Sequence, residues 1–143
     1  MKAKLALACM VLALTGCVTF FQYHPAPGEQ TATLKLGVPM IPFVYLTENE
    51  GCPKKRMDLS KGATAIPANK RLWVEPGFSS LGVPGGSECV IPMSFVAQPG
   101  KEYFVVYETA GHSCNARILT RNEGGKLVIE PSLKREKFER CMM

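Results

Sequence analysis

The sequence predicts an all-β fold, a single antiparallel β-sandwich of about seven or eight strands. From residue 31 onward, short segments rich in β-branched and aromatic residues alternate with clusters of Pro and Gly, which is typical of sandwiches and barrels. None of these segments has the apolar spacing of an amphipathic helix. The chain has 143 residues, 13 of them Gly and 11 Pro, a length that suits one domain.

The expected strands are each bounded by turn-forming residues. Residues 88–97 alternate, a Pro-Gly turn follows, and residues 102–109 are apolar on both faces, as in a buried central strand. We expect residues 113–121 and 126–129 to continue from that strand as an antiparallel meander. The other expected strands span residues 31–36, 42–47, 63–67 and 71–75.

The C-terminal segment, residues 131–143, differs from the rest in composition. Charged residues surround Leu133 and Phe138, which favours one short amphipathic helix fixed by a disulfide at Cys141. A disordered charged tail is the alternative. A bridged Cys141 argues against that alternative.

The first 16 residues have the pattern of a secretory signal, with Lys2 and Lys4 before an apolar run. That run, residues 5–15, is 11 residues long, whereas a transmembrane helix needs about 20. The sequence Leu14-Thr15-Gly16-Cys17 resembles the lipobox of bacterial lipoproteins, in which a branched apolar residue, a small residue and Gly or Ala precede a Cys. The alternative is an ordinary cleaved signal in which the cysteine is incidental.

The lipobox resemblance implies a specific mature form. Cys17 becomes the first residue, with a diacylglycerol on its thiol and a further acyl chain, such as palmitate, on its amine. Several acyl chains give stable membrane attachment. In lipoproteins of bacteria with two membranes, an Asp after the Cys signals retention in the inner membrane. The residue here is Val18, so the resemblance implies an outer-membrane protein that faces the periplasm.

This processing divides the chain into a signal peptide (1–16), a lipidated tether (17–30) and one β domain (31–143). Removing the signal leaves 15 basic and 12 acidic side chains, a formal charge of +3 over 127 residues. That charge is too small to indicate nucleic-acid binding. The expected partners are the membrane, through the lipid anchor, and a protein of the cell envelope. No cofactor is expected apart from the covalent lipid on Cys17.

Four cysteines remain once Cys9 leaves with the signal and Cys17 is acylated: Cys52, Cys89, Cys114 and Cys141. An even number in an oxidising compartment predicts two disulfides. If the segments with Cys89 and Cys114 flank one middle strand, they lie about 9.6 Å apart, beyond the ~7 Å limit between bridged Cα atoms. We therefore favour Cys52–Cys89 and Cys114–Cys141 among the three possible pairings.

No catalytic or metal site is predicted. Asp58 is the only aspartate, and the two histidines are His24 in the tether and His112 at an expected hairpin tip. Glycosidases use two carboxylates, and a Ser or Cys nucleophile needs a base close by. His112 and Cys114 could form a dyad or half a metal site, but a bridged Cys114 beside an exposed His112 is the favoured interpretation.

Two features are candidates for binding. Lys54, Lys55 and Arg56 follow Cys52-Pro53 and could contact phosphate groups or an acidic partner, although a solvated loop explains them as well. Trp73 could stack on a sugar, although a single Trp in a strand usually belongs to the core.

The segments 65–70 (Ala-Ile-Pro-Ala-Asn-Lys) and 95–103 (Phe-Val-Ala-Gln-Pro-Gly-Lys-Glu-Tyr) are similar to those of small immunoglobulin-like or transthyretin-like sandwich modules of periplasmic lipoproteins. The resemblance implies a sandwich and transfers no site residue. We expect a non-enzymatic outer-membrane lipoprotein that acts as an envelope binding or assembly module. The alternatives are an inhibitor of a lysozyme or other hydrolase, and an enzyme that uses His112 as its base.

Overall fold

The computed structural model describes residues 21–37, 43–47, 55–79, 88–110 and 113–137, and within these residues the chain forms strands and no helix. In chain order, the strands are β1 (Thr31–Leu36), β2 (Phe43–Thr47), β3 (Lys55–Arg56), β4 (Ala63–Pro67), β5 (Arg71–Ser79), β6 (Glu88–Val90), β7 (Met93–Val96), β8 (Glu102–Ala110), β9 (Ser113–Arg121), β10 (Leu127–Ile129) and β11 (Lys134–Arg135). The predicted all-β class is confirmed.

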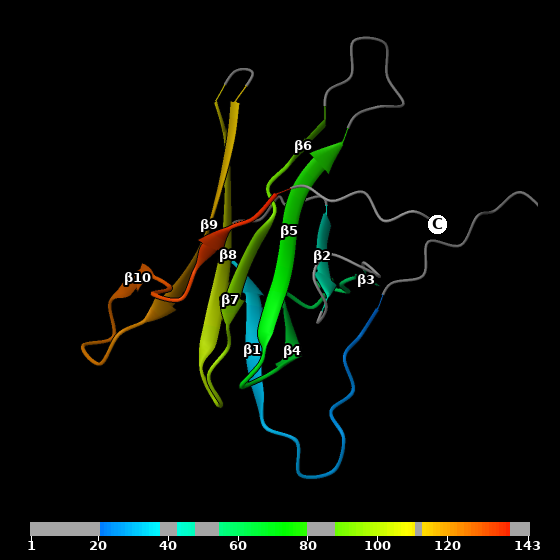
Figure 1. Cartoon of the computed structure of the whole chain (residues 1–143), viewed down its shortest axis with the longest axis vertical. Helices are drawn as coiled ribbons and strands as arrows, with labels where there is room; N and C mark the ends of the chain where they lie inside the picture. Colours follow the sequence, from blue (N-terminus) through cyan, green and yellow to red (C-terminus); the bar gives the residue numbers. More distant parts are fainter. Residues whose placement is uncertain (1–20, 38–42, 48–54, 80–87, 111–112, 138–143) are drawn as a thin grey trace, which may run out of the picture.

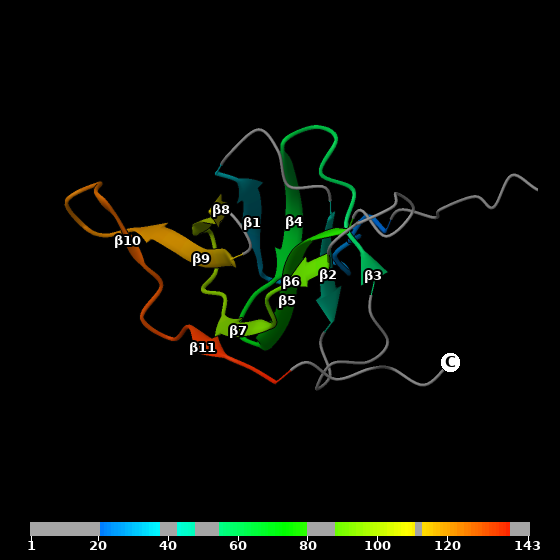
Figure 2. The same ribbon diagram turned by 90° about the horizontal axis from the view of Figure 1, so that it is seen from above.

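The strands form two sheets that pack face to face as a β-sandwich (Figures 1 and 2). The strand order in one sheet is β10-β9-β8-β1-β4, and in the other it is β11-β7-β5-β2-β3, with β6 also paired to β5. All pairings between the strands are antiparallel except that of β1 with β8. One lateral edge of the sandwich therefore consists of β10 and β11, and the other of β4 and β3.

The core lies between the sheets and is built from alternate residues of their strands. Tyr103 and Val105 of β8 are fully buried, as is Ile118 of β9. From the other sheet, Phe95 packs on Tyr103 with ring centroids 4.8 Å apart. Burying each such side chain contributes about 1.5 to 3 kcal/mol, so period-two alternation determines which face of each strand points inward.

Most expected strands are present with small changes of length. The expected strand at residues 88–97 is divided into β6 and β7, because Pro92 has no N–H to donate to a ladder. Both parts still pair with β5, which extends to Ser79 rather than ending at residue 75. The segment with Lys55 and Arg56, expected to be a loop, forms the short edge strand β3.

The predicted meander of β8, β9 and β10 is confirmed, and β8 is the middle strand of its sheet. The turn that precedes β8 behaves differently from the expectation. Residues 98–101 do not close a hairpin within one sheet but connect β7 of one sheet to β8 of the other. Gly100 has a φ of 71°, a left-handed conformation that favours Gly, and its N–H donates to the Thr31 carbonyl oxygen.

The expected C-terminal helix is wrong for the described part of that segment, residues 131–137. Here the chain is extended, and β11 pairs with β7. Backbone groups of β7 and its neighbours provide the hydrogen bonds that a helix would otherwise make internally. The Val96 N–H donates to the Ser132 hydroxyl at 2.8 Å, and the Glu136 N–H donates to the Pro92 carbonyl oxygen at 3.0 Å. Residues 138–143 lie outside the described residues.

Candidate functional site

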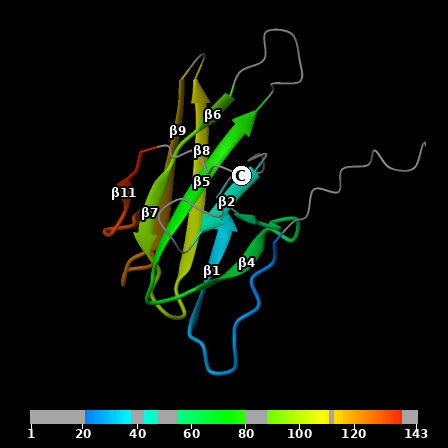
Figure 3. The same ribbon diagram turned by 45° about the vertical axis from the view of Figure 1, so that its right-hand side comes forward.

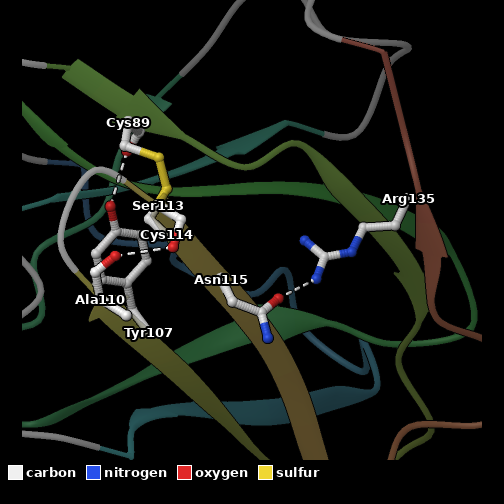
Figure 4. Close-up of a disulfide and its surroundings, with 7 residues drawn as sticks. All are labelled: Cys89, Tyr107, Ala110, Ser113, Cys114, Asn115 and Arg135. Carbon is white, nitrogen blue, oxygen red and sulfur yellow. Dashed lines mark hydrogen bonds between the residues drawn. A yellow bond between two sulfur atoms is a disulfide. The ribbon is translucent and has the colours of Figure 1, made fainter.

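A disulfide connects the two sheets between β6 and β9 (Figure 4). Its partners are Cys89 and Cys114, whose Cα atoms lie 6.4 Å apart and which are 25 residues apart in sequence. The Tyr107 hydroxyl donates a hydrogen bond of 3.0 Å to the Cys89 carbonyl oxygen. The bridge and this hydrogen bond together connect β6 to the other sheet.

The favoured pairing of Cys52 with Cys89 and of Cys114 with Cys141 is therefore wrong. It assumed that Cys89 and Cys114 flank one strand of a single sheet. The turn at residues 98–101 instead places them in different sheets, where they face each other across the sandwich. Cys52 and Cys141 lie outside the described residues, as do Cys17 and His112.

The side chains of the basic segment, residues 54–56, do not share one face, because successive residues of a strand alternate between its faces. Lys54 lies outside the described residues, and Lys55 is exposed on β3 in register with Leu46, whose side chain is in the core. The Lys55 ammonium lies 4.4 Å from the centroid of the Phe21 ring, a cation–π distance. Lys55 therefore covers the edge of the sandwich beside the N-terminal arm.

Arg56 is on the opposite face of β3 from Lys55, because successive strand residues alternate. It is in register with Tyr45 of β2 and is half-buried. Trp73, also half-buried, lies on β5, beyond β2 in the sheet order. Lys55 thus lies on the other face of the sheet from Arg56 and Trp73. These two share a face, since Arg56 is opposite Tyr45, Tyr45 is opposite Glu75, and Trp73 is two residues from Glu75.

The end of the expected tether is packed on the domain. Phe21 forms a bridge with Met57 and packs against the core cluster. Its N–H donates to the Arg56 carbonyl oxygen at 2.6 Å, and its own carbonyl oxygen accepts a 2.9 Å hydrogen bond from the Asp58 N–H. The arm is therefore held beside β3 at Phe21 (Figure 1), and Figure 3 shows it in blue on its way to β1.

A groove of about 590 Å³ lies at the other edge of the sandwich, a size within the range of small-ligand sites. Its walls come from Val96 and the 98–101 turn, from the end of β9 and the hairpin to β10, and from residues 130–132, which lead from β10 to β11. Val96, Val128 and Pro131 provide apolar surface, and Lys101 and Glu130 are among its charged residues. Sequence reasoning missed this site, because its parts are far apart in the chain.

Glu130 is the most unusual residue of the groove, since it is an acidic residue that is only 5% exposed. The Ser132 N–H and the Ser132 hydroxyl both donate to Oε1, at 3.1 and 2.9 Å. No lysine or arginine of the described residues forms an ion pair with it. Among the described residues, the buried side-chain oxygen without a hydrogen-bond partner is Thr64 Oγ1. Oε2 of Glu130, which accepts no hydrogen bond there, is therefore reached by solvent and can accept a hydrogen bond from a ligand.

Tyr103 is near the same carboxylate. Burial raises the pKa of the Tyr103 hydroxyl, and the negative charge of Glu130 raises it further, while the Gln98 N–H that donates to this hydroxyl at 2.8 Å acts in the opposite direction. The back of the groove is thus a low-dielectric environment, in which charge interactions are stronger than in water.

Asp58, the only aspartate of the chain, has a structural role. It accepts a hydrogen bond from the Ser60 N–H at 3.0 Å, and hydrogen bonds from the Ser60 side chain and backbone lower the pKa of its carboxyl group. His24 is exposed in the arm. Within the described ranges, no three His, Cys, Asp or Glu side chains gather as metal ligands, and no helix has the length and hydrophobicity to cross a membrane.

The fold and its disulfide define the chain as a cross-linked β-sandwich. No protein-family model, curated protein or solved structure matches it.

Proposed function

We propose that this chain is a non-enzymatic lipoprotein of the outer membrane, and that its sandwich is a periplasmic binding module with the β10 and β11 groove as its binding site. The single observation that supports this proposal best is the position of the arm. The arm packs at the β3 edge. The groove lies beside β10 and β11, which form the opposite edge of the sandwich (Figures 1 and 2).

The arm leaves little room between the domain and the lipid. Three residues lie between Cys17 and Phe21, and the four Cα–Cα steps of an extended chain span at most about 14 Å. A lipid on Cys17 therefore holds the β3 edge close to the membrane surface. Exposed Lys55 at this edge favours that orientation, since a basic side chain near an anionic surface contributes roughly 1 kcal/mol of attraction.

The opposite edge is then directed away from the membrane, where an envelope partner can reach it. The groove there combines apolar walls with a few polar groups, the composition of a ligand site. We assign binding rather than catalysis to this groove, whose described lining residues include no His, Cys or Asp. The mature domain is proposed to hold this groove at a fixed distance from the lipid.

Membrane attachment is tested with the full-length chain in cells. Wild type should fractionate with the outer membrane and carry a lipid on Cys17 by mass spectrometry, whereas Cys17→Ser should lose both properties. Val18→Ala is the matched control and should keep both. An unmodified Cys17 in the exported wild-type chain would refute the anchor.

The binding edge is tested by photo-crosslinking in the same cells. A photoreactive residue at Gln98, exposed at the groove, should give a protein or envelope-polymer adduct. One at Lys61, exposed near the arm, should give lipid adducts instead. Equal adducts from both positions would contradict the proposed orientation. An adduct of Gln98 with a lysozyme would replace the assembly role by hydrolase inhibition.

A further inference from the structure

Among the described residues, the groove has an acidic side chain with one carboxylate oxygen available at one place and a lysine without a partner at another. Glu130 Oε2 has no hydrogen-bond partner among the described residues, since both hydrogen bonds to the carboxylate end on Oε1. Lys101 is exposed, and its ammonium group makes no hydrogen bond, ion pair or ring contact within the same residues. Both side chains line the groove.

The other charged residues of the groove, Arg121 and Glu123, add little to its net charge. Arg121 also lines it, but its guanidinium donates to the Gly125 carbonyl oxygen at 2.9 Å and stacks on Phe104, with 5.6 Å to the ring centroid. Glu123 is exposed and formally balances Arg121. The groove therefore presents one buried negative group and one accessible positive group, with apolar surface from Val96 and Val128.

A peptide backbone also finds a matching surface here. β10 is the terminal strand of its sheet, paired only with β9 among the described strands. The backbone groups of Val128 face Thr120 of β9, so the outward backbone groups are those of Leu127 and Ile129, on either side of the groove residue Val128. A terminal strand leaves backbone donors and acceptors free for an added extended chain. Sugars and lipids lack this pattern of alternating N–H and C=O groups.

We propose that the groove binds a short zwitterionic peptide, with Glu130 accepting hydrogen bonds from its amino group and Lys101 pairing with its carboxylate. This inference rests on the proposed binding function, for which it names the ligand class, and it does not depend on the lipid anchor. The buried carboxylate provides the stronger contact, because charge-assisted hydrogen bonds are strongest away from water.

The test uses the full-length chain in detergent micelles and three probes: trialanine, N-acetyl-trialanine and trialanine amide. Amide shifts in NMR titrations give the affinity and locate the site. Trialanine should shift the amides of Gln98, Thr120 and Ser132. Acetylation of the amino group should weaken binding about tenfold or more, and amidation of the carboxylate about three- to fivefold, as expected for a buried and an exposed charge contact.

Two variants assign each end of the peptide to its residue. Glu130→Gln should weaken trialanine and trialanine amide but leave N-acetyl-trialanine unchanged. Lys101→Gln should weaken trialanine and N-acetyl-trialanine but leave the amide unchanged. Glu88→Gln and Lys126→Gln, exposed residues outside the groove lining, are the matched controls and should bind like wild type.

Three results would overturn the inference: equal affinity for the three probes, shifts remote from the groove, or no binding at millimolar peptide. If Glu130→Gln unfolds the chain, Lys101→Gln still decides the question, because the Lys101 side chain is exposed and makes no contact within the described residues. Failure of peptide binding together with an intact crosslink from Gln98 would remove the ligand class and leave the proposed function standing.

Discussion

Replacing both Cys89 and Cys114 with Ala removes the bridge between the two sheets and tests the disulfide assignment directly. The main expected effect is on the unfolded chain, which gains conformations when the loop is opened. The bridged residues are 25 apart in sequence, and loop closure of that length corresponds to about 3.5 kcal/mol at 25 °C. We expect the free energy of unfolding to fall by that amount.

This loss of unfolding free energy is large for a domain of this size. Stabilities of single domains are about 5 to 15 kcal/mol, and a loss of about 3.5 kcal/mol should lower the melting temperature by roughly 15 °C. The Tyr107 hydroxyl should retain its acceptor, the Cys89 backbone carbonyl, because the substitution changes only the side chain.

The assay is urea unfolding of the oxidised full-length chain, followed by circular dichroism. The linkage itself is read from a tryptic digest without reductant, in which residues 72–101 and 102–117 should appear as one linked species. Ser113→Ala, next to the bridge, is the control, and its loss should stay below about 0.5 kcal/mol. A double variant within 1 kcal/mol of wild type, or a digest that links Cys89 to Cys52, would refute the reasoning.

Three further substitutions test the packing and electrostatics of the fold. Arg135→Ala should cost about 1 kcal/mol in urea unfolding, because its guanidinium donates to Asn115 Oδ1 at 2.5 Å and to the Ala116 carbonyl oxygen at 2.8 Å, while exposed Lys134→Ala should cost less than half of that. Asn69→Ala should cost about 1 kcal/mol because Asn69 has a φ of 59°, and Asn69→Gly should recover most of the loss. Burial raises the pKa of the Tyr103 hydroxyl, so the unfolded chain releases the hydroxyl proton near pH 10 while the folded chain retains it. The free energy of unfolding should therefore be constant below pH 10 and fall as the pH rises through the pKa of the folded chain. The fall should be shallower in Tyr103→Phe.

The strands were predictable because each depends on a local pattern. Alternation at Tyr103, Val105 and neighbouring residues requires only that one face of a strand be buried, and the structure buries that face. Pro92 shows the limit of this reasoning, since the alternation continues across it while the ladder does not. A pattern of side chains predicts burial, whereas the ladder depends on each backbone N–H.

The pairing of strands was less predictable, because it depends on contacts between distant residues. The turn at residues 98–101 has the same composition whether it closes a hairpin or crosses between sheets. Its crossing reverses the conclusion about Cys89 and Cys114, which share no sheet. The C-terminal segment was misjudged for a related reason, because its charged residues suit a helix in isolation but pair with β7 in the fold.

The groove was not predictable for the same physical reason. Lys101, Val128 and Glu130 come from separate turns and strands, and each is ordinary in its local sequence. Glu130 is buried only because the chain crosses from β10 to β11 at that point, so its environment does not exist until both sheets are formed. The continuous run of Lys54, Lys55 and Arg56 drew attention in the sequence, yet alternation along β3 separates two of its side chains.

The two lateral edges of the sandwich are closed in different ways, and this difference explains why one edge suits attachment and the other suits binding. At the β3 edge, the Phe21 backbone adds hydrogen bonds on both sides of Met57 and its ring packs on the core. At the β11 edge, Arg135 reaches β9 through its side chain alone, which leaves space beside the crossing at residues 130–132. A closed edge transmits the position of an anchor to the whole domain, whereas an open edge with a buried carboxylate can accept a ligand without unpairing a strand. If the two edges act independently, a ligand of the groove should raise the free energy of unfolding by the same amount in the Cys17→Ser variant and in wild type.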